Sequence, residues 1–263
     1  VFHEGPGYAY ERLAGIPDRV AKFGFMHVAE FTALHPIYYG DERLRQFYEW
    51  LFTMGFTPFN WTTTFGDTIR TLPLNYCAGA YFAHRFSDVA AAHATHRLAI
   101  SGKPIGDVLT YAATAQPLPA PRRPASRVWT NGGALFWESS DLPEALMGAL
   151  WNVRPHSSKV AHMHKDVNAV YLAGYGEPLL VNVGYHYYGK GALGFSWNYI
   201  NNTAVANNVL LVGGADHRSK SGDKISEHLV SAQFDYASGF ADAALAGAAF
   251  YHRNFMFVHP QDG

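Results

Sequence analysis

Apolar residues recur at helical spacing through the first 113 residues. One stripe follows Pro17, and a second follows Asp41 in the run DERLRQFYEWLFTM. Asp41 is placed to cap this second helix, and Gly55 to end it in the left-handed conformation. Weaker helical patterns follow at 74–86, 88–100 and 105–113. Helices joined by short loops predict a partial (α/α) toroid over residues 1–113.

The periodicity changes after a proline-rich stretch. Residues 114–126, TAQPLPAPRRPAS, contain four prolines, which exclude regular helix or central strand and predict an extended linker. Beyond it, short β-prone runs are separated by Gly, Asn or Pro: RVWTNGGALFWES, AVYLAGYGEPLLVNV, NNVLLVGG, EHLVSAQFDY and RNFMFVH. The predicted fold class is therefore α+β, with a toroid followed by an antiparallel β-sandwich over residues 127–263.

Composition narrows the classes of function. A chain of 263 residues with 48% hydrophobic content can bury one large core or two modest ones. Twenty Lys and Arg against 21 Asp and Glu provide no net field for binding nucleic acid or an anionic membrane. With Cys77 alone, no internal disulfide is possible. No targeting or membrane-spanning segment is visible. Because Val1 is not a start methionine, we expect an internal portion of a longer protein.

The densest polar group lies in AHMHKDVNAVYLAG, where His162, His164, Asp166 and Asn168 occupy alternate positions. On a β-strand, alternate side chains share one face. Two imidazoles beside a carboxylate suit a metal site or an acid/base pair. The alternative is the solvated face of an antiparallel strand, which needs no function.

Three further stretches are candidates for binding. In GEPLLVNVGYHYYG, a turn at Gly176 and Glu177 is expected to lead into a strand that brings Asn182 towards the histidines. The loop that follows carries several aromatic residues, which favour either sugar binding or loop packing: Tyr185, Tyr187, Tyr188, Trp197 and Tyr199. In FGDTIRTLP, Asp67 and Arg70 are placed either to contact an acidic sugar or to form a surface ion pair.

Taken together, these motifs resemble the heparinase II/III-like polysaccharide lyases. The matching stretches are AHMHKDVNAVYLAGYGEPLLVNVGYHYYG, ANNVLLVGG and the N-terminal EGPGYAYERL. The order toroid, linker, sandwich also agrees with that family. The resemblance implies a lyase that cleaves a uronic-acid polysaccharide, such as alginate or a glycosaminoglycan-like polymer, by β-elimination. It also implies export to the periplasm or outside the cell.

β-Elimination needs a neutralised uronate carboxylate, a base for the C5 proton and an acid for the C4 oxygen. The resemblance implies that Tyr8 is the catalytic tyrosine of the toroid, acting as acid or base, and that Tyr10 takes this role if the alignment shifts. It also implies that His162 is the active-site histidine of the sandwich, which binds the carboxylate or takes the proton. Tyr199 lies where alginate-type members place a second catalytic tyrosine. Glu4, Tyr10 and Tyr185 are expected to contact the substrate.

The resemblance also implies a zinc ion beneath the active site, held at positions that fall on His164, Asn182 and Asn207. The chain departs from the family here, because two ligand positions are neutral amides and zinc prefers Cys, His and carboxylate ligands. Asp166 or His186 could substitute as ligands. Alternatively, the two amides could hydrogen-bond to His164 and hold the strands together without an ion.

Two other functions stay open at this point. A uronyl C5-epimerase shares the proton abstraction but returns the proton to the opposite face of the sugar. A non-catalytic glycan-binding module would account for the changed metal positions. In each case the expected partner is an acidic polysaccharide or oligosaccharide.

Overall fold

The computed structural model describes residues 6, 42–55, 62–68, 125–138, 144–154, 163–185, 203–219 and 222–260. Its elements are α4 (Glu42–Met54), β1 (Arg127–Trp129), β2 (Gly133–Trp137), β3 (Met147–Trp151), β4 (Ala169–Gly174), β5 (Glu177–Leu180), β6 (Lys224–Leu229), β7 (Phe234–Phe240), β8 (His252–Val258) and two 3-10 turns, η2 (Ala204–Ala206) and η3 (Asp242–Ala244). Among these residues, we find no helix with both the length and the hydropathy of a membrane span.

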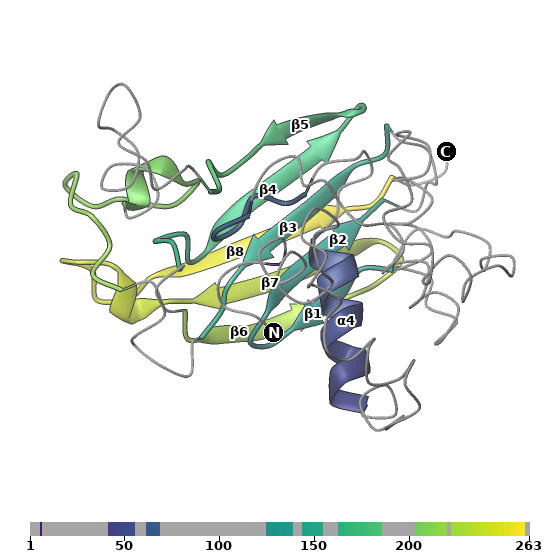
Figure 1. Ribbon diagram of the computed structural model, residues 1–263, viewed down its shortest axis with the longest axis horizontal. Helices are drawn as coiled ribbons and strands as arrows, with labels where there is room; N and C mark the ends of the chain where they lie inside the picture. Colours follow the sequence, from purple (N-terminus) through teal and green to yellow (C-terminus); the bar gives the residue numbers. More distant parts are fainter. Residues whose placement is uncertain are drawn as a thin grey trace, which may run out of the picture.

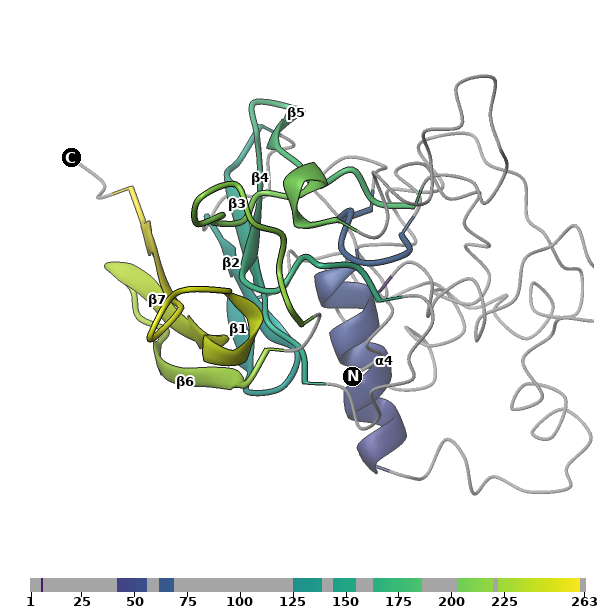
Figure 2. The same cartoon turned by 90° about the vertical axis from the view of Figure 1, so that its left-hand side faces the viewer.

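The described residues form three layers. Strands β1 to β5 make one antiparallel sheet in sequence order, and β6, β7 and β8 make a second. The two sheets face each other, and α4 covers the opposite side of the larger sheet (Figures 1 and 2). The prediction of antiparallel β-structure is confirmed. The other predicted toroid helices lie outside the described residues, so the toroid stays a prediction.

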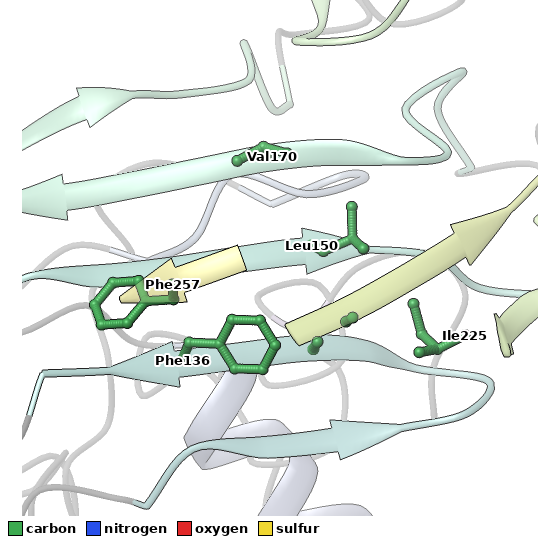
Figure 3. Packing of buried hydrophobic residues seen from close by; sticks show 7 residues of the cluster. Phe136, Leu150, Val170, Ile225 and Phe257 are labelled. Carbon is green, nitrogen blue, oxygen red and sulfur yellow. The ribbon is translucent and has the colours of Figure 1, made fainter. Parts of the chain in front are cut away.

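One face of the larger sheet packs against the smaller sheet. Phe136, Leu150 and Val170 from the larger sheet meet Ile225 and Phe257 in one buried cluster, which Figure 3 shows from close by. Side chains alternate between the two faces of a strand, so each of these residues has neighbours that point the other way. Burial of this apolar area from water is the main force that holds the two sheets together.

The opposite face of the larger sheet is equally apolar, which explains why all residues of β2 and β3 are buried. The Trp151 ring stacks on Phe65 with centroids 5.2 Å apart, and lies 6.3 Å from the Trp50 ring of α4. Trp50 donates from Nε1 to the carbonyl oxygen of Gly132, at 3.2 Å. Segments that precede the proline-rich stretch are thereby fixed to the sandwich by aromatic packing.

Helix α4 confirms the helix that the apolar stripe after Asp41 predicted, but the end of this helix differs from the prediction. Gly55 is absent from the described residues that have a positive φ. Its N–H donates to the carbonyl oxygen of Leu51 at 2.9 Å, and a Cβ on Gly55 would lie 2.5 Å from that oxygen. Glycine is therefore needed at this helix end for a close approach and not for a left-handed backbone.

Three details of the β-region also differ from the sequence predictions. The β4–β5 turn is Tyr175–Gly176, with φ of 56° and 76°, which suits a two-residue hairpin, and Glu177 already belongs to β5. The run NNVLLVGG is not a strand, since it contributes only an isolated bridge between Val212 and Ala215. Strand β3 was not predicted, because its short apolar run MGALW lacks alternation.

Candidate functional site

The sequence predicted nine site residues, and the structure describes four of them. His164, Asn182 and Asn207 are the family zinc positions, and Tyr185 is an expected substrate contact, which is partly exposed. The remaining candidates lie outside the described residues, namely Glu4, Tyr8, Tyr10, His162 and Tyr199, together with Arg70 and His186.

The prediction that His164, Asp166 and Asn168 share one face of a strand is wrong. Residues 163–168 form an irregular loop, and β4 begins only at Ala169. Asn168 has a φ of 61°, in the left-handed region that Asn tolerates better than most residues. The polar side chains of the loop therefore point to different partners, whereas alternate residues of a β-strand would all point to one face.

His164 is paired with a carboxylate from a distant part of the chain. Its Nε2 lies 2.7 Å from Oδ1 of Asp67, and the two side chains are only 2% and 1% exposed. Asp67 is therefore buried and does not lie on the surface, where the sequence alternatives of an ion pair or a sugar contact would need it. A polar pair shielded from water to this degree positions the chain, because neither group is accessible to a polymer.

Asp166 makes a second buried connection to the same segment. Its Oδ2 accepts a hydrogen bond from the backbone N–H of Gly66 at 2.7 Å. Burial raises the pKa of Asp166 above its ordinary value, although the nearby His164 and hydrogen bonds from Gly66 and Trp151 act in the opposite direction. Asp166 thus bonds to the backbone of residues 62–68, and Asp67 from those residues bonds to His164 of the loop 163–168.

The same segment is also held on its other side. We call residues 62–68 the inserted segment. The Thr64 hydroxyl donates to the backbone oxygen of Asn182 at 2.6 Å, and the N–H of Tyr185 donates to the oxygen of Thr68 at 3.0 Å. A Cβ on Gly184 would lie 2.4 Å from that Thr68 oxygen. The inserted segment therefore lies between the loops 163–168 and 181–185.

The two amides at the family zinc positions bond to backbone groups. Asn182 accepts on Oδ1 from the N–H of Asn208 at 2.9 Å, and its Nδ2 is buried with no hydrogen-bond partner. Asn207 directs its Nδ2 to the oxygens of Lys165 and Thr203, at 3.4 and 3.3 Å. The prediction that both amides bond to His164 is wrong, since His164 is bonded to Asp67 instead.

A partly exposed ion pair closes this region on the outside. Lys165 Nζ lies 2.5 Å from Oδ2 of Asp216, with 20% and 40% of the two side chains exposed. Burial opposes the charged form of Asp216, but hydrogen bonds from Lys165 and from the N–H groups of Ala204 and His217 outweigh it and lower its pKa. The pair fastens the loop 203–219 over the loop 163–168.

Beneath these loops, two buried asparagines connect the sheets. Asn152 Nδ2 donates to Asn168 Oδ1 at 2.7 Å and to the oxygen of Phe240 at 2.9 Å. Asn168 Nδ2 donates to the oxygen of Gly239 at 2.9 Å. A side chain on Gly239 would collide with the Asn168 amide. Asn168, which directly precedes β4, thus links the end of the loop 163–168 to β7 and is not a member of the polar site.

Sequence reasoning did not identify Asp67, Thr64 and Gly66 as partners of the sandwich loops. They come from the segment WTTTFGDT, where Asp67 lies 97 positions before His164. Local pattern marked this segment as a loop and offered Asp67 as a sugar contact or as a member of a surface ion pair, but not as a partner of His164. The contacts depend on how a distant element docks, and a single sequence carries no signal of such docking.

Comparison with known proteins shows which solved structures have a similar fold. No protein-family model and no curated protein matches this chain. Heparan sulfate lyase HepC from Pedobacter heparinus matches with a TM-score of 0.67 and 17% identity, and a heparinase III gene product with 0.67 and 15%. Both matches cover 98% of this chain and 36% of the other. A further heparinase III gives 0.62 at 14% identity, covering 89% of this chain and 35% of that one.

Identities this low establish likeness of fold alone. The likeness extends over nearly the whole chain, yet the chain spans only about a third of the length of these lyases. The chain therefore has a polysaccharide-lyase-like fold.

Proposed function

We propose that this protein is a polysaccharide lyase that cleaves a uronic-acid-containing polysaccharide by β-elimination. The observation that carries the proposal is the structural likeness to heparan sulfate lyase HepC over 98% of the chain. A second support is the order of motifs in the sequence, where EGPGYAYERL precedes HMHKD and GEPLLVN, as the family resemblance implies. The fold and the order of motifs thus point to the same class of enzyme.

The reaction removes the proton at C5 of the uronate and breaks the bond between C4 and its oxygen. Tyr8 is the proposed acid/base, and His162 is proposed to bind the carboxylate or take the proton. Tyr199 is the proposed second tyrosine. Hydrogen-bond donors at the carboxylate stabilise the negative charge that develops when the C5 proton leaves. A tyrosine serves in proton transfer when its neighbours bring its pKa down from about 10.

The described residues support this chemistry indirectly. His162 is two residues from His164, which is immobilised by Asp67, and Tyr185 follows Gly184 on the other side of the inserted segment. A catalytic group close to residues held by such buried hydrogen bonds would lose less conformational freedom on binding substrate. The proposed substrate contacts are Glu4, Tyr10 and Tyr185.

The substrate proposed first is a heparan-sulfate-like glycosaminoglycan, since that is the polymer named for HepC. Alginate is the second candidate. An acidic polysaccharide of either kind is a large polymer found outside the cytoplasm, so we propose a periplasmic or extracellular location.

The direct test is incubation of the full-length protein with a panel of uronate polymers. A rise in ultraviolet absorbance from new unsaturated chain ends is the expected result. If solvent deuterium enters at C5 without chain cleavage, the protein is a uronyl C5-epimerase and not a lyase. Polymer binding measured by calorimetry, with neither cleavage nor exchange on any polymer, would instead indicate a glycan-binding module.

A further inference from the structure

The residues at the family zinc positions do not fit a zinc ion. Asn182 contributes a neutral amide whose oxygen already accepts a hydrogen bond and whose buried Nδ2 is a donor. The Nδ2 of Asn207 is directed to two backbone oxygens. Zinc is held by thiolate, imidazole and carboxylate, and an amide N–H donor offers it no lone pair. His164 is the one residue of the three with a suitable side chain.

No substitute ligand set is present in the described part of the chain. No three His, Cys, Asp or Glu side chains there are grouped so that they could hold a metal ion. Asp166, which the sequence offered as a replacement ligand, binds the N–H of Gly66 instead. The donors around His164 are therefore arranged for hydrogen bonding within the protein.

We propose that His164, Asp67 and Asp166 form a metal-independent tether that holds the inserted segment on the sandwich, in place of the zinc ion that the family resemblance implies. The Asp67 carboxylate accepts a hydrogen bond from Nε2 of His164, and the Asp166 carboxylate accepts a hydrogen bond from the backbone N–H of Gly66. Each bond crosses between residues 62–68 and the loop 163–168, so the two loops are joined twice.

The surroundings complete this tether. Thr64 and Thr68 bond to the backbone of Asn182 and Tyr185, so the inserted segment is fixed on both sides. Phe65 stacks on Trp151 and contacts Tyr171 at a centroid distance of 6.2 Å, which keeps water from the polar bonds. A hydrogen bond to a carboxylate is strengthened in such a low-dielectric site, and an unpaired partner there is correspondingly costly.

The first test measures metal directly, and it does not depend on the proposed function. We expect the full-length protein, purified without metal resins, to contain well under one zinc per chain. Its melting temperature should not change when a strong chelator is added. One zinc per chain whose removal lowers the melting temperature would overturn the proposal.

The second test separates the tether from general stability. We expect Asp67→Asn and His164→Gln each to lower the melting temperature by roughly 10 °C, because each leaves a buried partner poorly satisfied. The double variant should lose little more than the worse single variant. Fully additive losses would contradict a shared bond. Asp216→Asn, in the partly exposed pair with Lys165, is the control and should change the melting temperature far less.

A third measurement remains available if a variant does not fold. In nitrogen-15 NMR of the unaltered protein, His164 Nε2 should carry a proton that is hydrogen-bonded to a carboxylate. A signal of a metal-coordinated imidazole nitrogen at His164 would overturn the proposal without any substitution.

Discussion

Nε2 of His164 lies 2.7 Å from Oδ1 of Asp67, although 97 positions separate the two residues in the chain. Both side chains are almost fully buried. The bond joins a segment that precedes the proline-rich stretch to the loop that follows β3 in the sandwich. Its consequence is that the loop 163–168, which contains His164, is positioned by a residue from another part of the chain.

A close backbone contact at Gly184 predicts a specific stability difference. Gly184 and Gly176 have φ of 69° and 76°, so alanine strains the backbone at either position by about 1–2 kcal/mol. Only at Gly184 would the new Cβ also meet the Thr68 oxygen, at 2.4 Å, whereas at Gly176 it meets nothing within 4 Å. Gly184→Ala should therefore lower the free energy of unfolding clearly more than Gly176→Ala in urea titrations.

The same pair of variants can be compared by limited proteolysis. Displacement of the inserted segment should expose its backbone to protease in Gly184→Ala and not in Gly176→Ala. Equal stability and equal cleavage of both variants would contradict a tight contact between Gly184 and Thr68.

The asparagine link between the sheets gives a second prediction. Asn168→Gly removes the amide but retains a residue that accepts the positive φ of 61°. Asn152 then loses one acceptor and the Gly239 oxygen loses its donor, so we expect a loss of about 2–4 kcal/mol in unfolding free energy. Chemical denaturation followed by tryptophan fluorescence measures this loss. A change below about 0.5 kcal/mol, as at ordinary surface positions, would refute it.

The pair formed by Lys165 and Asp216 predicts a dependence of stability on acid. The pKa of Asp216 lies below its ordinary value of 3.8 in the folded state. A lowered carboxyl pKa contributes stability that is present above the unfolded pKa and is lost as the pH falls through the folded pKa. The stability difference between the unaltered protein and Asp216→Asn should therefore shrink as the pH falls below about 4.

Urea unfolding at a series of pH values from neutral to acid checks this expectation. Lys165→Gln serves as the companion variant, because it removes the main charge partner of Asp216 while retaining the carboxyl group. It should reduce the same acid-dependent difference. A difference that widens towards acid would show the opposite shift in pKa.

The proposed chemistry predicts the effect of removing one phenol. Tyr8→Phe should lower the rate of formation of unsaturated ends at least about 100-fold, because general acid–base groups contribute about 10² to 10⁴ in rate. Tyr175→Phe is a matched control, since Tyr175 lies 73% exposed in the β4–β5 turn. Retained activity in Tyr8→Phe together with loss in Tyr10→Phe would move the role to the alternative register.

Local patterns in the sequence determined several elements of the fold. The stripe from Leu44 to Leu51 predicted α4, and runs rich in β-branched and aromatic residues predicted most of the sandwich strands. These predictions succeeded because helix and strand periodicity reflect which face of an element is buried, and that information lies within a few neighbouring residues.

Tertiary structure alone decided the loop 163–168 and its partners. Strict alternation from His162 to Asn168 indicated one polar face, yet Asn168 adopts a left-handed backbone and binds Gly239. Asp67, which looked like a surface residue, became the buried partner of His164. Burial of a polar group requires a hydrogen-bond partner from whichever element packs beside it, and that neighbour is set by the docking of distant segments.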